Sequence, residues 1–168
     1  MPERELRWPV DNYSTGDFYK FGDRVGSRGG WVSHLGDDVK ASAGTVVRAV
    51  GAGEVAQAET RAGSGEKRNW GGVILIKHAG FYSVYGHLDN LKVQVGDRVE
   101  AGEEIGRVAR ALTPENGWWQ NEHLHFAIYT GSWRPGVALP GYYRWWQFRT
   151  KKKWWRDPQD FIKNYNDG

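Results

Sequence analysis

Two histidines alternate with apolar residues in the stretch His123-Leu124-His125-Phe126-Ala127-Ile128-Tyr129. In a β-strand, successive side chains point to opposite faces, so residues two apart share a face. The pattern therefore predicts a strand over 123–129. It also puts His123 and His125 on one surface, with their Cα atoms about 7 Å apart. That geometry can place one imidazole on a metal ion and the other beside it; the alternative is a pair of exposed or hydrogen-bonded strand histidines.

Short runs of β-branched residues broken by glycine occupy much of the chain from Thr45 onward. Such runs predict strands, and His78-Ala79-Gly80-Phe81 predicts a tight hairpin connection between two of them. We expect six further strands, over residues 45–50, 54–58, 73–78, 82–87, 91–95 and 105–109. Residues 60–69 and 110–122 are predicted loops, because glycine, proline and polar residues interrupt any regular pattern there.

An internal echo indicates that the sheet is folded over on itself. The same short pattern occurs twice, 52 residues apart, as Gly44, Val47 and Ala49 and as Gly96, Val99 and Ala101. Each copy is followed by glycine and then by an apolar strand, which fits a β-sandwich better than a helical fold. The one predicted helix is short and C-terminal, over 157–163, with Asp157 as N-cap and Pro158 at the first helical position.

Length and composition exclude several classes of protein. The 168 residues suit one compact domain, and 39% hydrophobic with 26% charged residues is typical of globular proteins. With 23 basic and 20 acidic residues, the net charge of +3 is too small to indicate nucleic acid as a partner. The absence of cysteine excludes disulfide frameworks, thiolate zinc sites and cysteine nucleophiles. The longest aliphatic run, Val73-Ile74-Leu75-Ile76, is far shorter than the roughly 20 residues of a transmembrane segment, and no signal peptide is recognised.

A second element suited to metal binding is His34-Leu35-Gly36-Asp37-Asp38. It places an imidazole and a carboxylate four residues apart, and Gly36 allows the backbone to turn tightly between them. Zn²⁺ accepts such nitrogen and oxygen donors, and three protein ligands leave one position for water. With the His-x-His strand this segment completes a ligand set, although alone it is typical of a surface turn. His87, at the end of a predicted strand, is a further candidate or a turn cap, and His78 is expected to be structural.

Several ordered motifs give the chain a family resemblance. They are, in order, Trp8-Pro9-Val10, Phe21-Gly22-Asp23-Arg24, the His34 to Asp38 segment, Tyr85-Gly86-His87-Leu88, the glycine-containing run from Val93 to Gly106, and His123-Leu124-His125-Phe126. On these motifs the chain resembles the lysostaphin- and LytM-type zinc endopeptidases, metallopeptidase family twenty-three, from about Trp8 to Tyr129. The resemblance implies a mostly β fold: a compact antiparallel β-sandwich or folded sheet of the duplicated hybrid motif type, with long loops around a groove.

The resemblance also implies the site. One zinc ion per chain would be bound by His34, Asp38 and His125, and His123 and His87 would be the catalytic histidines. The family spacing selects Asp38, so we expect the neighbouring Asp37 to be a solvated turn carboxylate.

The implied activity is zinc-dependent endopeptidase cleavage of peptide cross-links in bacterial peptidoglycan by a metal-activated water. Bound zinc lowers the pKa of its water from about 15.7 to about 7. We expect His123 to be the general base, and His87 to orient water or donate to the oxyanion. The alternative is a non-catalytic peptidoglycan-binding relative that activates another wall hydrolase. Such relatives typically lack ligands, and none is missing here.

Substrate contacts are expected around the groove. Trp118 and Trp119 lie in the loop immediately before the catalytic strand, which favours a role in a groove wall. Tyr85 either hydrogen-bonds near the oxyanion or packs as a strand aromatic. Glu122 and Ala127 depart from the family pattern, and the loop before His123 is unusually long, so these changes bear on substrate choice.

We expect a single domain over 1–168, consisting of a peptidase core over 8–130 and a Trp- and Lys/Arg-rich extension over 131–168. Seven of the ten Trp follow Gly117. Their rings either contact glycans, anionic wall polymers or lipid, or wrap the core and are buried. The resemblance implies peptidoglycan peptide stems or cross-bridges as partners, a monomer, and the cell envelope or extracellular space as location.

Overall fold

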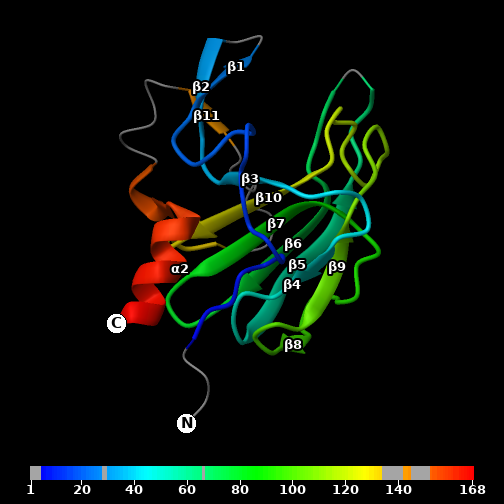
Figure 1. Cartoon of the computed structure of the whole chain (residues 1–168). Coiled ribbons are helices and arrows are strands. Elements are labelled where there is room, and N and C mark those ends of the chain that lie inside the picture. Colours follow the sequence, from blue (N-terminus) through cyan, green and yellow to red (C-terminus); the bar gives the residue numbers. More distant parts are fainter. Residues whose placement is uncertain (1–4, 28–29, 66, 134–141, 145–151) are drawn as a thin grey trace.

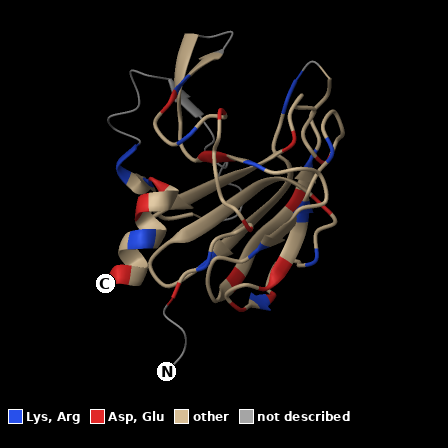
Figure 2. Cartoon of the chain, in the orientation of Figure 1, with Lys and Arg blue, Asp and Glu red and all other residues tan. Residues whose placement is uncertain are grey.

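The computed structural model describes residues 5–27, 30–65, 67–133, 142–144 and 152–168. The chain is mostly antiparallel β-structure with a short C-terminal helix, so the predicted fold class is confirmed (Figure 1). No helix in the described ranges is both long enough and apolar enough to cross a bilayer. Acidic and basic residues are interspersed along the strands and the helix (Figure 2), as the small net charge suggests.

The main sheet has nine strands among the described residues. They are β3 (Asp37–Lys40), β4 (Val46–Arg48), β5 (Gly53–Arg61), β6 (Gly71–Lys77), β7 (Tyr82–Asp89), β8 (Arg98–Val99), β9 (Glu104–Val108), β10 (His123–Tyr129) and β12 (Trp155–Arg156). The order β12-β10-β7-β6-β5-β8 forms its main path, with β3 added on β10 and with β9 bridging β4 and β7. Strand β10, which pairs with β3, β7 and β12, begins and ends at the predicted residues.

A smaller sheet stands beside one end of the main sheet (Figure 1). It consists of β1 (Arg24–Ser27), β2 (Gly30–His34) and β11 (Tyr142–Arg144), in the order β1-β2-β11. Only two residues, Leu35 and Gly36, separate β2 from β3. The chain therefore passes directly from the small sheet onto the edge of the main sheet.

Alternation along β10 separates two apolar clusters. Leu124, Phe126 and Ile128 enter the larger cluster, between the folded halves of the sheet. Ala127 enters a smaller cluster on the opposite face, together with Leu35. His123 and His125 share the face of Ala127, because they lie at even spacing from it. The histidines thus lie outside the main core, on the face that the β2–β3 connection covers.

The sequence echo corresponds to a structural repeat. Gly44 and Gly96 both adopt a positive φ, of 86° and 94°, which favours glycine. The Gly44 amide donates to the carbonyl of Val108, and the Gly96 amide donates to the carbonyl of Val55, at 2.8 and 2.9 Å. In return, the Val108 amide donates to the carbonyl of Thr45, and the Val55 amide donates to the carbonyl of Asp97. The two copies therefore close equivalent turns onto the opposite half of the sheet.

Two parts of the strand prediction were wrong. Residues 91–95 form no strand, because they make only one backbone hydrogen bond to a neighbouring strand residue, from Lys92 to Ile105, before the chain turns at Gln94. Conversely, the short strands β8, β11 and β12 were not predicted. Strands β1, β2 and β3 also lie in a region for which no strand was predicted. Their glycines and charged residues hide the alternation that these strands adopt when paired.

Part of the C-terminal extension packs onto the core. Helix α2 (Pro158–Asp167) starts where predicted, with the Asp157 carboxylate accepting from the amides of Gln159 and Asp160. Its Ile162 is buried in the larger cluster. Strand β12 pairs with β10 and buries Trp155, whereas Trp154 is 46% exposed. Trp145 and Trp146, which were expected either to contact wall polymers or lipid or to be buried against the core, lie outside the described ranges.

Candidate metal centre and groove

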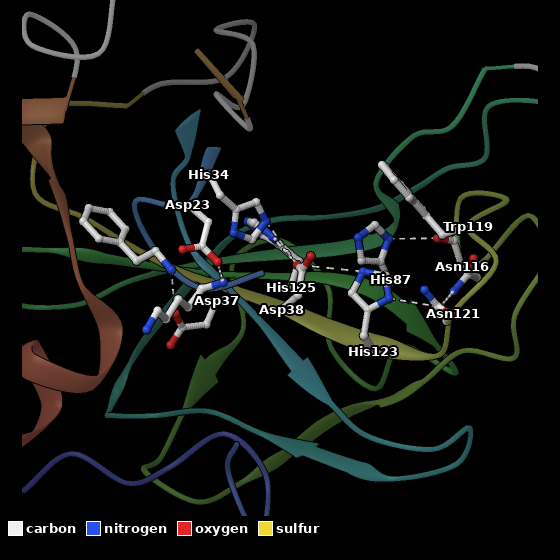
Figure 3. Close-up of polar contacts among 12 residues, drawn as sticks. Asp23, His34, Asp37, Asp38, His87, Asn116, Trp119, Asn121, His123 and His125 are labelled. Carbon is white, nitrogen blue, oxygen red and sulfur yellow. Dashed lines mark hydrogen bonds and ion pairs between the residues drawn. The ribbon is translucent and has the colours of Figure 1, made fainter. Parts of the chain in front are cut away.

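The pairing of β3 with β10 brings the first two candidate ligands together. In this antiparallel register Asp38 lies directly opposite His125, and Lys40 lies opposite His123. Directly opposed residues project from the same face of a sheet. His34, the last residue of β2, reaches this face from the small sheet. The three side chains converge on one point above β10 (Figure 3).

The donor atoms of these three residues lie within 4.8 Å of one another, and all three residues are buried. Asp38 Oδ1 is 3.0 Å from His125 Nδ1 and 3.2 Å from His34 Nε2. The same oxygen lies 3.8 Å from His123 Nε2. Two imidazoles and one carboxylate thus form a compact N, N, O donor set.

The electrostatics of this cluster favour the protonation states that bind metals. Burial opposes ionisation of Asp38, but the hydrogen bonds and charges of His125 and His34 outweigh it and hold the pKa of Asp38 well below its ordinary value. Burial lowers the pKa of His125, although Asp38 opposes this shift. The groups therefore tend toward a carboxylate and a neutral imidazole, the forms that coordinate zinc.

Position 36 has room for glycine but not for a residue with a side chain. A Cβ at this position would lie 2.5 Å from the carbonyl oxygen of Phe126 and 2.9 Å from His125 Nε2. Its φ is not in the left-handed region, so the tight turn predicted from Gly36 is instead a close crossing of the β2–β3 connection over β10. This close contact allows His34 to reach Asp38.

His87 reaches the site because of a β-bulge. Between β6 and β7, Gly72 pairs with Leu88 and Ile74 pairs with Tyr85, so β7 has one extra residue in this interval. His87 adopts a φ of 66°, which is uncommon for a residue other than glycine. Tyr85 and Leu88 both enter the larger cluster despite being three residues apart. The bulge turns the intervening His87 toward the opposite face.

His87 and His123 lie side by side next to the ligand cluster, with ring centroids 4.5 Å apart (Figure 3). Each directs Nδ1 to a backbone carbonyl of the 110–122 loop: His87 to Asn116 at 2.8 Å and His123 to Asn121 at 3.0 Å. Because a carbonyl only accepts, each Nδ1 must donate. In the neutral ring this leaves Nε2 as an acceptor facing the site. Burial, followed by the nearby His123 and His125, lowers the pKa of His87 well below its ordinary value.

The role of these two asparagine carbonyls could not be predicted from the sequence. A backbone carbonyl has no residue signature, and only the length of the 110–122 loop indicated a special function. The Asn116 amide group also donates to the carbonyl of Asn121 at 3.1 Å, which braces the loop.

Trp70 is a further residue that sequence reasoning missed. Its ring stacks on His87 with an interplanar angle of 19°, and its edge-to-face contact with His125 has a centroid distance of 5.1 Å. The indole occupies the space left by Gly86, where a Cβ would lie 2.7 Å from the ring. Trp70 thus fixes the orientation of two histidines at once.

A groove of about 480 Å³ runs along this face and is lined by both polar and aromatic residues. The lining residues are Asp17, Phe18, Tyr19, Val25, Gly26, Asp38, Arg68, Trp119, Gln120, Asn121 and His123. Of the three residues expected to bind substrate, Trp119 lines the groove, and Trp118 and Tyr85 do not. Tyr85 is fully buried, and its hydroxyl accepts from the Val50 amide at 3.0 Å.

The structure corrects the expectation for Asp37. Its side chain is 1% exposed and points away from Asp38, toward the larger cluster. The carboxylate accepts from the Tyr13 hydroxyl at 2.6 Å and from the Phe21 amide at 2.9 Å. Strand alternation therefore separates the two adjacent carboxylates: Asp38 faces the site, and Asp37 anchors the N-terminal segment.

Comparison with known proteins gives the family. The family model described as Peptidase family M23 matches residues 32–135, more than half of the chain. The chain belongs to peptidase family M23. The matched range includes all three candidate ligands as well as His87 and His123.

Two curated relatives of this M23 peptidase match nearly its whole length. The glycyl-glycine endopeptidase ALE-1 of Staphylococcus capitis is 33% identical, over 95% of this chain and 36% of that protein. Lysostaphin of Staphylococcus simulans is 31% identical, over 99% of this chain and 28% of its own length. The M23 peptidase thus spans about a third of the length of these relatives.

Solved structures give the same fold. The catalytic domain of the antimicrobial peptidase lysostaphin from Staphylococcus simulans aligns with a TM-score of 0.58 and 27% identity, over 86% of this chain and 90% of that chain. LytU aligns with a TM-score of 0.63 and 25% identity, over 94% and 91% of the two chains.

The residues at which this M23 peptidase departs from the family pattern have structural roles. Glu122 accepts from the backbone amides of Ala43 and Ala111, at 3.0 and 3.2 Å, and so ties the loop before β10 to the chain after β3. Ala127 is buried in the smaller cluster, beneath Gly36. Both substitutions therefore shape the surroundings of the groove without removing a candidate ligand.

Proposed function

We propose that this chain is a zinc-dependent endopeptidase that hydrolyses peptide cross-links of bacterial peptidoglycan. The observation that carries the proposal is the buried convergence of His34, Asp38 and His125 beside two further histidines at a groove. The relatives add support, because ALE-1 is named a glycyl-glycine endopeptidase and lysostaphin an antimicrobial peptidase.

The donor set fits zinc. Zinc binds imidazole nitrogen and carboxylate oxygen at about 2.0–2.2 Å, so ligand atoms in a tetrahedral site lie roughly 3.4 Å apart. The separations of 3.0 and 3.2 Å from Asp38 Oδ1 to the nitrogens of His125 and His34 are close to this value. Catalytic zinc sites commonly have three protein ligands and one open position, and this set has the same number.

When bound there, zinc supplies a Lewis acid for the scissile carbonyl and lowers the pKa of water to about 7. His123 lines the groove and presents Nε2 as an acceptor, so it accepts the proton of the attacking water and returns it to the leaving amine. His87 is buried and neutral, and its Nε2 also accepts, so it orients the water. Donation from His87 to an oxyanion would require a protonated ring, which burial opposes.

The test combines metal analysis with product analysis. We expect the purified protein to contain about one zinc per chain, to release peptide fragments from peptidoglycan, and to lose this activity reversibly in a chelator. His125→Ala should lose both zinc and activity. Mass spectrometry of the fragments identifies the bond that is cut.

The matched control is His78→Gln, which changes a buried histidine outside the site and should retain zinc and activity. Fragments released by His125→Ala as fast as by the parent protein would contradict the proposal. A protein that binds peptidoglycan and zinc but releases no fragment would instead be the non-catalytic wall-binding relative.

A further inference from the structure

An arginine lies on the wall of the groove, over the ring of a tryptophan. Arg68 precedes β6, and its guanidinium carbon lies 5.1 Å from the centroid of the Trp119 ring. Trp119 is held in turn, because its Nε1 donates to the carbonyl of Asn69 at 2.9 Å and its own carbonyl accepts from the Leu112 amide at 2.9 Å. A guanidinium stacked on an indole keeps its in-plane donors available for a ligand.

Arg68 lies close enough to the histidines to contact a bound peptide near the bond that is cut. The Trp119 ring centroid is 6.4 Å from that of His123 and 5.9 Å from that of His87. The Arg68 guanidinium carbon lies 5.1 Å from the same Trp119 centroid, so it is no more than about 11.5 Å from the His123 ring. An extended peptide advances roughly 3.3–3.6 Å per residue, so Arg68 is within about three residues of the reacting bond.

The charges around the groove leave Arg68 available for a ligand. Among the described lining residues, the charged side chains are Asp17, Asp38 and Arg68. Asp38 belongs to the candidate metal centre, and Asp17 pairs with Lys40 at 3.2 Å. None of the described carboxylates forms an ion pair with Arg68. The described wall of the groove therefore presents one cation toward the substrate.

We propose that Arg68, stacked on Trp119, is a substrate subsite for a free carboxylate. The enzyme would then prefer a peptide cross-link that carries a carboxylate within about three residues of the scissile bond, as a chain terminus or an acidic side chain. A planar guanidinium binds a carboxylate through two parallel hydrogen bonds, which a neutral carboxamide cannot match. This inference rests on the proposed endopeptidase function and narrows its substrate class.

The test uses fluorogenic oligoglycine peptides in which one residue is Glu or the isosteric Gln, moved one position at a time along the peptide. We expect one position at which the Glu peptide is cleaved with about fivefold higher kcat/KM than the Gln peptide. Arg68→Gln should remove this preference, so that the Glu and Gln peptides are cleaved with equal kcat/KM at that position. Arg68→Lys should restore only part of it, because lysine lacks the planar fork. Lys67→Gln, which removes an exposed neighbouring cation, should retain the full preference.

Binding of the same peptides, labelled and followed by fluorescence anisotropy, separates the two proposals. If no peptide is cleaved but Glu peptides still bind more tightly in an Arg68-dependent manner, the endopeptidase proposal fails and the carboxylate subsite holds. If cleavage occurs but Glu and Gln peptides react and bind equally at every position, the subsite is wrong. An equal loss of preference in Lys67→Gln would also overturn it, because the effect would then reflect net charge.

Discussion

Adjacent side chains in this protein serve separate purposes. Asp37 and Asp38 are neighbours on β3, yet one anchors the N-terminal segment and the other joins the histidine cluster. The difference arises from strand alternation alone, which sends successive side chains to opposite faces. The pair therefore offers a matched comparison of two buried carboxylates within one strand.

We expect Asp38→Asn to lower zinc content to near zero and to reduce kcat/KM by at least about 100-fold, because a ligand charge is lost. Asp37→Asn should retain one zinc per chain but lower the free energy of unfolding by about 1–3 kcal/mol, since it weakens buried charged hydrogen bonds. Metal analysis, kinetics and urea unfolding measure the two effects. Loss of zinc in Asp37→Asn but not in Asp38→Asn would reverse the assignment.

His78 lies outside the groove, and its environment should make the stability of the protein depend on pH. Its Nδ1 donates to the carbonyl of Ala52 at 2.8 Å, and its Nε2 lies 2.7 Å from Ser83 Oγ. Burial lowers the pKa of His78, and the hydrogen bond to Ala52 opposes this only partly. As pH falls below about 6.5, the unfolded chain therefore binds a proton that the folded protein resists, and stability is lost.

His78→Gln should accordingly weaken the loss of unfolding free energy between pH 7.5 and pH 5. Urea unfolding of parent and variant in chelator, at both pH values, isolates this difference from metal binding. The remaining histidines contribute equally to both proteins. An identical pH slope in the variant would show that His78 is not responsible.

At the scale of loops and strands, the loop that supports His87 and His123 depends on close backbone contacts. The Asn69 amide donates to the carbonyl of Gly117 at 3.0 Å, and the Gly72 amide donates to the carbonyl of Glu115 at 2.8 Å. Gly117 has a φ of 78°, and a Cβ there would lie 2.0 Å from the Asn69 carbonyl oxygen. The loop can approach β6 this closely only because glycine occupies the contact.

Gly117→Ala should therefore lower the free energy of unfolding by at least about 2 kcal/mol and reduce kcat, because the carbonyl partner of His87 moves with the loop. Gly80→Ala is the control. Gly80 also has a positive φ, of 90°, but a Cβ there meets nothing within 4 Å. Gly80→Ala should lower the free energy of unfolding only by the smaller cost of backbone strain, and it should keep full activity. Equal effects of the two substitutions on kcat would contradict the supporting role of the loop.

Features that depend on residues close together in the sequence could be predicted, whereas features that depend on distant partners could not. Strand β10 could be predicted residue for residue, because its alternation is visible in sequence. The orientation of His87 could not, since it depends on a one-residue bulge set by pairing with β6. Asp37 was wrongly expected in solvent because its partners, Tyr13 and Phe21, are distant in sequence. The candidate metal residues came from ordered motifs, whereas Trp70 had no motif to mark it.

For the molecule as a whole, the candidate metal centre lies between two sheets. His34 comes from the small sheet, whereas Asp38 and His125 come from the main sheet. An ion bound by all three would link the sheets, and only the folded state brings the three residues together. Binding should therefore stabilise the fold as well as support activity.

We expect a chelator to lower the melting temperature of the parent protein by roughly 5–10 °C, the shift for a ligand near 100 times its Kd in a chain of this length. Differential scanning fluorimetry with and without added zinc measures this. His125→Ala should melt at the same temperature in either condition. A parent protein that carries zinc yet melts identically without it would show that the ion does not link the two sheets.

The two ends of the described chain meet. The Leu6 amide donates to Asn166 Oδ1 at 2.7 Å, and the Asn166 side-chain amide donates to the carbonyl of Leu6 at 2.9 Å. Both ends lie on the side away from the loops around the groove (Figure 1). A module fused before or after this domain would therefore emerge from one common corner. It could act as a tether to an insoluble polymer while leaving the cleft unobstructed, whichever end carried the fusion.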